Sequence, residues 1–432
     1  MKLTTRSRLL MALTVFSLFF GAGNLIFPPF LAAQAGTQTW PAMLGFCLTA
    51  IGCPVLGVVA VARFGSLERL AGQVHPVFAG VFILLIYLAI GPGLAIPRTA
   101  STSFEMLALA FAGPDAPLGL LQAGYSLLFF TLATLIALKP AALTQRLGKV
   151  LCPTLLCLIA VLFAASLAAP HGYGPVNAEA YAAAAPLQGF LDGYQTMDAI
   201  AALVFGGVIA LNLQGLGVKD EKAMVAETTR AGLGAGVLLL AVYCALAHVG
   251  GVSGGAWPGA ANGAQVLTNM AGGVFGHVGM VLLAAIFVVA CLNTCIGLLS
   301  SVGGCFHRLM PRLSYPVWVG VFALLSAVIS NAGLNQILSL SVPVLNLLYP
   351  PAIVLILLAF VPDSRHRPLL WPLAGWTTAA VSALTCAGRA GLLPAALTGL
   401  LEHLPLYFMD LAWLLPAAIA AAIGWAARRS PE

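Results

Sequence analysis

The stretch Phe20-Gly-Ala-Gly-Asn-Leu-Ile-Phe-Pro-Pro29 lies in the middle of the first long apolar segment, where a membrane-spanning helix is expected. Glycines weaken a helix there, and Pro28 and Pro29 cannot donate backbone hydrogen bonds. Irregular backbone at membrane depth is tolerated only where it is buried in protein or lines a cavity. The freed N–H and carbonyl groups can then hold a carboxylate or a cation, and Asn24 adds a neutral oxygen suited to sodium. A kink used only for close helix packing is the alternative.

The composition is that of a polytopic membrane protein. Of the 432 residues, 61% are hydrophobic and only 7% are charged, whereas a soluble domain carries about 25% charged residues. The nine cysteines lie mostly in apolar runs without metal-ligand spacing, so we interpret them as packing residues. Lys2, Arg6 and Arg8 precede an apolar run, as in a signal peptide, but this run continues to about residue 35. We therefore expect an uncleaved first span.

Twelve apolar stretches are long enough to cross a bilayer, for which about 20 residues are needed. They cover residues 8–34, 40–62, 77–111, 118–138, 147–169, 187–216, 231–251, 273–306, 314–332, 335–361, 369–391 and 407–427. An even number of spans puts both termini on the same side of the membrane. Three of the spans, 8–34, 77–111 and 273–306, are longer than a bilayer needs, so we expect them to be tilted or broken.

The positive charges indicate which side holds the termini. If the N-terminus is inside, seventeen of the nineteen Lys and Arg residues lie in inner loops or at inner helix ends, while Arg389 lies outside and Arg98 within a span. This asymmetry predicts cytoplasmic termini under the positive-inside rule. The inner residues are Lys2, Arg6, Arg8, Arg63, Arg69, Lys139, Arg146, Lys149, Lys219, Lys222, Arg230, Arg308, Arg312, Arg365, Arg367, Arg428 and Arg429.

A second interruption falls in the sixth span, in Gly189-Phe-Leu-Asp-Gly-Tyr-Gln-Thr-Met-Asp198. Breaks in spans one and six, five helices apart, are typical of two five-helix repeats of inverted topology, and such paired breaks indicate a transporter's central site. We therefore predict an all-α fold with a first repeat at 1–169, a second at 170–361 and peripheral helices at 362–432. Residues 252–272, rich in Gly and Ala, are expected to form either a re-entrant, lid-like loop or an ordinary flexible outer loop.

Several other polar side chains lie inside predicted spans. Asn293 and Thr294 are adjacent in span eight, so two oxygens can border one ion; interhelical hydrogen bonding is the alternative. Arg98 and Glu105 share a helical face but lie about 10 Å apart, too far to pair directly. Asp198 is our candidate partner for Arg98, because an unpaired charge in a bilayer is costly. The alternative is that Arg98 and Glu105 lie near the outer interface.

Motifs of enzymes carry little weight here. Gly251-Val-Ser-Gly-Gly255 matches a nucleophile pattern but lacks a preceding strand. The sequence has no Walker A motif, no H-E-x-x-H and no cytoplasmic domain that could hydrolyse ATP. Uphill transport would therefore use an ion gradient. We expect no enzyme activity, although an intramembrane enzyme is the alternative from another class and a passive channel is a third.

Four motifs resemble the BrnQ-type branched-chain amino acid:cation symporters of bacteria, and this resemblance covers essentially the whole chain. The motifs are Phe20–Pro29, Pro97-Arg-Thr-Ala-Ser-Thr-Ser-Phe-Glu105, Gly193-Tyr-Gln-Thr-Met-Asp198 and Ser341-Val-Pro-Val-Leu-Asn-Leu-Leu-Tyr-Pro-Pro351. The resemblance implies Na⁺-coupled uptake of leucine, isoleucine and valine across the bacterial inner membrane, with H⁺ coupling as the alternative. It also implies the five-plus-five inverted-repeat fold of the amino acid–polyamine–cation superfamily, which the sodium-coupled leucine transporters share.

Similarity to these leucine and neurotransmitter transporters implies the site residues. Their first helix has a Gly-x-Gly-Asn break, so Asn24 resembles a sodium ligand beside the Phe19 carbonyl, and the Ala22 to Asn24 backbone resembles a cradle for the substrate carboxylate. Thr196 matches their sodium-binding threonine, whereas Asp198 departs from their small polar residue. The substrate ammonium would meet carbonyls around Gly193 and Thr196, or Asp198. A second sodium site is implied at Asn293, Thr294 and the carbonyls of Ala290, Ser17 and Phe20.

The sequence thus predicts a secondary active transporter with a branched aliphatic amino acid as substrate and Na⁺ as the coupling ion. The rival within transport is proton coupling, with Asp198 or Glu105 as the proton carrier. Apart from the ion no cofactor is expected. The lipid bilayer is the expected surrounding, and neither a nucleic acid nor an obligate protein partner is implied.

Overall fold

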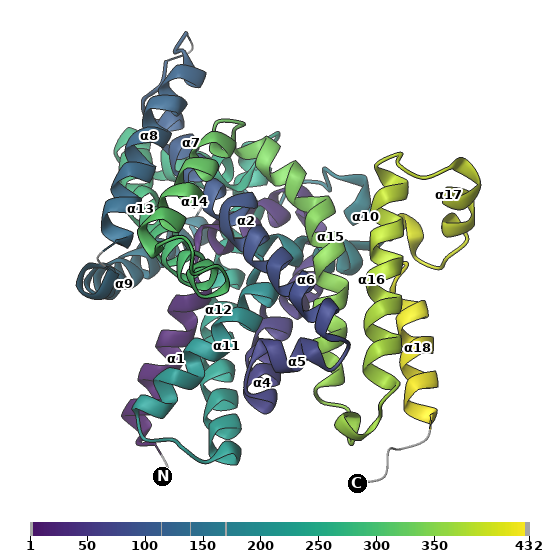
Figure 1. Cartoon of the computed structure of the whole chain (residues 1–432). Coiled ribbons are helices and arrows are strands. Elements are labelled where there is room, and N and C mark those ends of the chain that lie inside the picture. Colours follow the sequence, from purple (N-terminus) through teal and green to yellow (C-terminus); the bar gives the residue numbers. More distant parts are fainter. Residues whose placement is uncertain (1–2, 114, 139, 169–170, 428–432) are drawn as a thin grey trace.

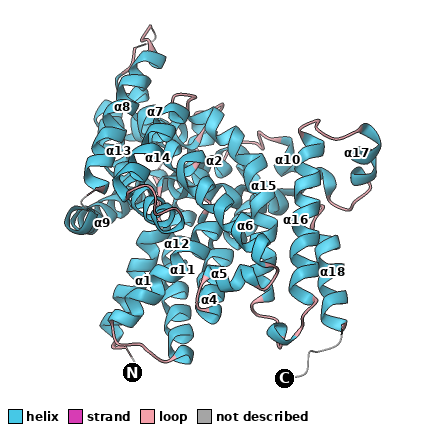
Figure 2. Cartoon of the chain, viewed as in Figure 1, coloured by secondary structure: helices cyan, strands magenta, loops and turns pink. Residues whose placement is uncertain are grey.

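The computed structural model describes residues 3–113, 115–138, 140–168 and 171–427, and only the backbone of residues 140–152. Helices and their connections account for all of these residues, with no strand among them (Figure 2). The twelve predicted spans each correspond to one or more helices. Four of the inner-side cations predicted above, Lys2, Lys139, Arg428 and Arg429, lie outside the described residues, as do the side chains of Arg146 and Lys149.

The first span is broken into two helices, α1 (Thr5–Phe19) and α2 (Ala22–Ala35). The break is shorter than the sequence suggested, because only Phe20 and Gly21 are extended and the two prolines lie inside α2. Proline removes the hydrogen bond to the carbonyl four residues earlier. The carbonyls of Asn24 and Leu25 therefore lack a helical donor, so the polar backbone of this region extends into the first turns of α2.

The third span is also broken, as its length predicted. Helices α6 (Pro76–Leu88) and α7 (Ala95–Phe111) are joined by the π-helical turn η3 (Ala89–Gly93), in which Gly91 has non-helical dihedrals (φ −90°, ψ −128°) next to a proline. The second span is continuous but contains a similar turn. It consists of α3 (Thr39–Cys47), η2 (Leu48–Gly52) and α4 (Cys53–Phe64), and the short helix η1 (Gly36–Gln38) precedes it, while α5 (Leu67–Gly72) follows it.

The sixth span breaks where the sequence predicted. Helix α10 (Glu179–Asp192) leads into the 3-10 turn η4 (Gly193–Thr196), and Met197 then adopts a left-handed conformation (φ 64°) before α11 (Asp198–Gly215) begins. A left-handed methionine cannot continue either helix, so it fixes the end of the turn. The fourth and fifth spans, between the broken third and sixth spans, are α8 (Leu118–Ala137) and α9 (Pro140–Leu167).

Residues 252–272 form neither of the two loops expected from sequence. Most of them belong to the end of α12 (Glu221–Ala256) and the start of α13 (Gly263–Leu309), which bends at Gly276 (φ 62°). Both helices touch α2 closely, because a Cβ on Gly250 would meet the Pro29 carbonyl oxygen at 2.1 Å, and one on Gly263 the Ile26 carbonyl oxygen at 1.8 Å. Gly263 was interpreted as part of a loop, whereas here it lets the backbones of α13 and α2 approach each other.

The remaining helices complete the second half and the periphery. They are α14 (Tyr315–Ser330), α15 (Leu334–Leu358), η5 (Ser364–His366), α16 (Leu370–Arg389), α17 (Ala395–Glu402), η6 (Tyr407–Met409) and α18 (Leu414–Ala426). Helices α16 and α18 pack on each other beside α15, at the edge of the molecule (Figure 1). Helix α1 begins and α18 ends at the same end, as an even number of spans requires (Figure 1).

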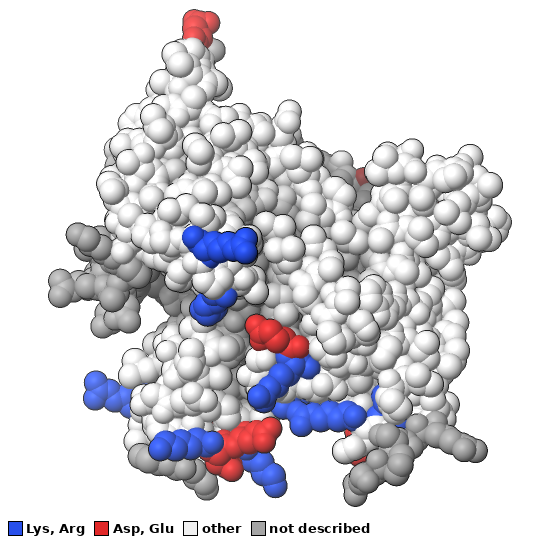
Figure 3. Space-filling model, viewed as in Figure 1, with Lys and Arg blue, Asp and Glu red and all other residues white. Residues whose placement is uncertain are grey.

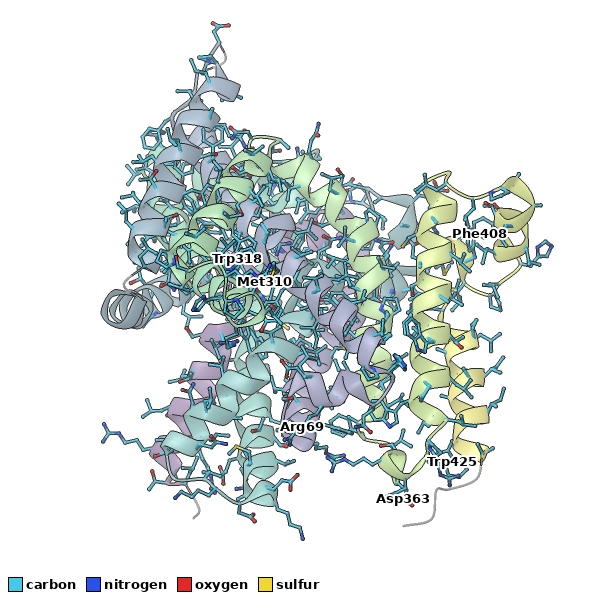
Figure 4. The ribbon with its side chains drawn as sticks, in the orientation of Figure 1. Arg69, Met310, Trp318, Asp363, Phe408 and Trp425 are labelled. Carbon is cyan, nitrogen blue, oxygen red and sulfur yellow. The ribbon has the colours of Figure 1, made fainter. Side chains whose placement is uncertain are left out.

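Charged side chains on the face shown in Figure 3 gather mostly toward the end where α1 begins, and a broad uncharged surface lies above them. Arg69, Asp363 and Trp425 lie at that charged end, whereas Phe408 lies toward the opposite end beside α17 (Figure 4). Seven described helices or helix runs are long and apolar enough to cross a membrane, and shorter apolar helices such as Tyr315–Ser330 and Leu414–Ala426 complete the set. The fold is that of an all-α, multi-pass membrane protein.

Candidate functional site

A buried polar cluster joins the two broken spans. Asn24 in the first turn of α2, Asp198 at the start of α11 and Tyr243 in α12 are 2%, 4% and 0% exposed. The Asn24 amide nitrogen donates both to Oδ2 of Asp198 and to Oη of Tyr243, and this hydroxyl in turn lies 3.3 Å from the same carboxylate oxygen as a donor. Asn24 Oδ1 accepts from the Gly21 N–H at 3.0 Å. The Asn24 side chain therefore caps α2 and also binds the carboxylate.

The turn before α11 brings Gly193 and Thr196 to the same cluster. Oγ1 of Thr196 donates to the Gly193 carbonyl at 2.9 Å and accepts from the Asp198 N–H at 3.4 Å. Asp198 is the first residue of α11, where the positive end of the helix dipole favours a negative charge. Tyr243 was missed by the sequence analysis, because a lone tyrosine in an apolar helix carries no signal of which neighbour its hydroxyl meets.

Arg98 is buried (4% exposed) near the start of α7, directly after the break in the third span. The structure does not contain the predicted Arg98–Asp198 ion pair, since no nitrogen–oxygen distance between them falls within 4.0 Å. Instead, Nη1 donates to the Gln195 carbonyl at 2.7 Å, and the guanidinium lies 5.2 Å from the centre of the Phe27 ring. The η4 turn presents a backbone carbonyl to the arginine, which partly satisfies it without a carboxylate.

Glu105 lies elsewhere, two turns further along α7. Its Oε1 accepts from the side-chain amides of Asn262 at 3.2 Å and Gln265 at 3.0 Å, where α13 begins. Its hydrogen-bond partners among the described residues are therefore not those of Asp198. Of the three charges that the sequence grouped together, only Arg98 and Asp198 bond to residues at the breaks in spans one and six.

Thr294, a residue of the predicted second ion site, lies beside the break in the first span. Gly21, in the first break, lies against Thr294, because a Cβ on the glycine would be 3.5 Å from Cγ2 and 3.8 Å from Oγ1 of that threonine. Thr294 Oγ1 donates to the Ala290 carbonyl at 3.1 Å, and Oδ1 of Asn293 is buried without a hydrogen-bond partner among the described residues. The carbonyls of Ser17, Phe19 and Phe20 lie at the open end of α1, where helices leave carbonyls unpaired. No group of three His, Cys, Asp or Glu side chains that could hold a metal occurs in the described part.

A cavity of about 260 Å³ opens between α2, α10 and α15. Phe27, Phe30, Leu31, Leu338 and Val342 provide an apolar wall, and the polar lining comes from Tyr181, Asp192, Gln195 and Ser339. The Asp192 carboxylate accepts from Oη of Tyr181 at 2.6 Å and from the Gln188 amide at 2.9 Å. Phe27 and Gln195, which both contact Arg98, belong to this lining, so the cavity lies next to the partners of a buried charge.

On the other side of the break, an ion-pair cluster fixes α1. Arg8 donates to Glu227 in α12 through Nε at 2.9 Å and Nη2 at 2.8 Å, and Arg230 donates to the same carboxylate at 2.6 Å. Glu227 is 4% exposed. The sequence analysis counted both arginines as topology signals and did not identify this carboxylate, because nothing in a single sequence links two residues so far apart.

Comparison with known proteins agrees with this architecture. A family model described as branched-chain amino acid transport protein matches residues 4–430. The chain is 38% identical to the branched-chain amino acid permease BraB of Bacillus subtilis, covering 98% of this chain and 96% of BraB. It is 41% identical to the branched-chain amino acid transport system 2 carrier protein of Pseudomonas aeruginosa, covering 94% and 92% of the two chains.

Solved structures show the same fold at low sequence identity. Mhp1, a nucleobase-cation-symport-1 family transporter, superposes with a TM-score of 0.58 at 12% identity, covering 96% of this chain and 91% of that one. A manganese transporter of Eremococcus coleocola gives a TM-score of 0.57 at 16% identity, covering 98% and 97%. Fold and sequence thus agree with the resemblance stated from the motifs: the chain belongs to the branched-chain amino acid transport proteins, a family of membrane permeases and carriers rather than of enzymes.

Proposed function

We propose that the protein imports leucine, isoleucine and valine together with Na⁺ across a bacterial cytoplasmic membrane by alternating access. The observation that carries the proposal is the buried cluster of Asn24, Asp198 and Tyr243, in which two interrupted helices meet. Paired interruptions near the bilayer midplane are where transporters of this architecture bind their substrate. The relatives described above, which are branched-chain amino acid permeases and carriers, suggest the substrate class.

The substrate carboxylate would meet the backbone of Ala22 to Asn24 at the start of α2, and the ammonium would meet Asp198 or the carbonyls near Gly193 and Thr196. An apolar pocket discriminates one methylene by only about 1–3 kcal/mol. Leucine, isoleucine and valine would therefore share the site with modest preference. Rocking of residues 1–169 against residues 170–361 around this site, with 362–432 at the periphery, would then expose it to each side in turn.

Sodium is the proposed coupling ion, at one site beside Asn24, Thr196 and the Phe19 carbonyl and at another beside Asn293 and Thr294 with the carbonyls of Ala290, Ser17 and Phe20. The unpaired buried Oδ1 of Asn293 supports the second site, because a buried oxygen without a donor is available to a cation. One elementary charge gains about 2.3 kcal/mol per 100 mV, which supports roughly 50-fold accumulation of a zwitterion. Both termini would be cytoplasmic.

Proton coupling is the second candidate, and Asp198 is the observation that favours it, since this carboxylate is buried among neutral donors. Radiolabelled leucine uptake into proteoliposomes separates the two. Accumulation with an inward Na⁺ gradient but not with an equal choline gradient is the result expected here. Accumulation in both, lost when a pH gradient is collapsed, would instead assign the coupling to a proton. No accumulation under any gradient would contradict the transport proposal itself.

A further inference from the structure

We propose that Arg98 and Asp198 bind the two charges of the zwitterionic substrate, Arg98 its carboxylate and Asp198 its ammonium. This inference rests on the proposed function, in which the carboxylate meets the backbone of Ala22 to Asn24. It adds Arg98, which lies against Gly23, as a second partner of that carboxylate and selects Asp198 as the partner of the ammonium. Both side chains are 4% exposed, and no ion pair joins them, yet neighbouring residues of α2 contact both of them. A single zwitterion placed between them neutralises both.

Most N–H groups of the Arg98 guanidinium have no hydrogen-bond acceptor among the described residues. A guanidinium carries five N–H groups in a planar fork that matches a carboxylate with two parallel hydrogen bonds. The described residues give this guanidinium one hydrogen bond, from Nη1 to the Gln195 carbonyl, together with the face of the Phe27 ring. A buried cation in a membrane is costly and is normally paired. A substrate carboxylate is the partner that this arrangement lacks.

The Asp198 carboxylate likewise has no hydrogen bond from a charged donor among the described residues. Its partners are the Asn24 amide and the Tyr243 hydroxyl on one oxygen, with the Thr196 hydroxyl beside its backbone N–H. These groups are neutral, so they orient the carboxylate without compensating its charge. An ammonium group supplies three N–H donors and one positive charge.

Two consecutive residues of α2 contact the two charges. The Asn24 amide donates to Asp198, and Gly23 lies against Arg98, because a Cβ on Gly23 would be 2.8 Å from Nη2. The first turn of α2 therefore lies beside both groups. A methyl group at Gly23 would displace the guanidinium.

The cavity between α2, α10 and α15 provides access from one side. Its lining includes Phe27 and Gln195, which contact the guanidinium, together with an apolar wall and the polar side chains of Tyr181, Asp192 and Ser339. An amino acid that enters with its charged end first would approach Arg98 past Phe27 and Gln195. Its aliphatic side chain then lies against Phe27, Leu31 and Leu338, where burying it is favourable.

Ligand analogues test this assignment in the purified full-length protein. Binding of leucine, of leucinamide, which lacks the carboxylate, and of 4-methylpentanoate, which lacks the ammonium, is measured by ligand-induced thermal stabilisation. In the wild-type protein both analogues should bind on the order of 10- to 100-fold more weakly than leucine, the range of a charge-assisted hydrogen bond. Arg98→Gln should weaken the binding of leucine by a similar factor and leave the binding of leucinamide unchanged, so that the preference for leucine over leucinamide disappears. Asp198→Asn should instead remove the preference for leucine over 4-methylpentanoate.

Other outcomes are equally informative. If Arg98→Gln weakens the binding of leucine and of leucinamide by the same factor, Arg98 is a structural residue and the assignment is wrong. Gly23→Ala serves if the charge variant does not fold, because it displaces the guanidinium without removing the charge and should also reduce the preference for leucine over leucinamide. An unchanged preference there overturns the assignment. A wild-type protein that binds none of the three compounds would contradict the proposed function itself.

Discussion

Replacing Gly250 by alanine should separate α12 from α2 and displace the first break. A Cβ at this position would lie 2.1 Å from the carbonyl oxygen, 2.4 Å from Cα and 2.6 Å from the carbonyl carbon of Pro29. Ordinary van der Waals contact begins at 3.4 Å, so the two backbones must separate by more than about 1 Å. The clash is with backbone on both sides, and no rotamer change can relieve it.

The expected net effect follows from two opposing contributions. Overpacking of a close contact costs about 1–3 kcal/mol, and occasionally more. Alanine is favoured over glycine in a helix interior by about 1 kcal/mol, which offsets part of this cost. Because the clash involves three backbone atoms, we expect destabilisation to prevail, with a lower unfolding temperature and a loss of leucine uptake as α2 moves with Asn24.

Gly207→Ala is the matched control, since Gly207 lies in α11 and a Cβ there would have nothing within 4 Å. This variant gains the helix propensity without the clash and should unfold at or above the wild-type temperature with full uptake. Both variants are compared by thermal unfolding in detergent and by uptake into proteoliposomes. A Gly250→Ala protein that is as stable and as active as Gly207→Ala would refute the close contact between α2 and α12.

Three further outcomes are expected. Thr294→Ala should raise the Na⁺ concentration for half-maximal leucine uptake by about tenfold, the effect of one lost hydrogen-bonding oxygen; a sodium titration measures it, and an unchanged midpoint contradicts the second ion site. Arg8→Ala should release α1 from α12 and so speed thiol labelling of Ser17→Cys in a background without native cysteines. The increase should be less than about fivefold, since the Arg8–Glu227 pair is partly exposed. Arg230→Ala breaks a contact within α12 and should leave the labelling rate unchanged, so equal rates in the two variants would contradict the role of Arg8 in holding α1. Bulky thiol reagents attached to Ser339→Cys should slow uptake by filling the cavity beside it, and leucine should protect; modification without effect would exclude the cavity as the access route.

The positions of the breaks could be predicted from sequence because they depend on local chemistry. Glycine and proline weaken a helix wherever they occur, so Gly21 and Gly193 marked interruptions that the structure contains. The extent of each break could not be predicted in the same way. Pro28 and Pro29 lie inside α2, although each removes a backbone hydrogen bond of the helix. This helix packs closely against Gly250 and Gly263, which lie far away in the sequence.

Side-chain partners were harder to predict than breaks, because a partner lies elsewhere in the chain. Asp198 was expected beside Arg98 on the grounds that opposite buried charges attract, but the carbonyl of Gln195 lies closer to the guanidinium. Tyr243 and Glu227 carried no local signal, since each is a single polar residue in a long helix. The ion and substrate roles of the first break stay predictions, as does the direction of transport.

The measurement that tests sodium symport most directly is ²²Na⁺ entry into proteoliposomes, with and without external leucine. Coupling through the broken helices predicts that leucine stimulates ²²Na⁺ entry in the wild-type protein. At a Na⁺ concentration near the wild-type midpoint, the stimulation should be reduced in Thr294→Ala and kept in Gly207→Ala, whose substitution lies in open space. Equal ²²Na⁺ entry with and without leucine, in vesicles that accumulate leucine, would contradict sodium symport.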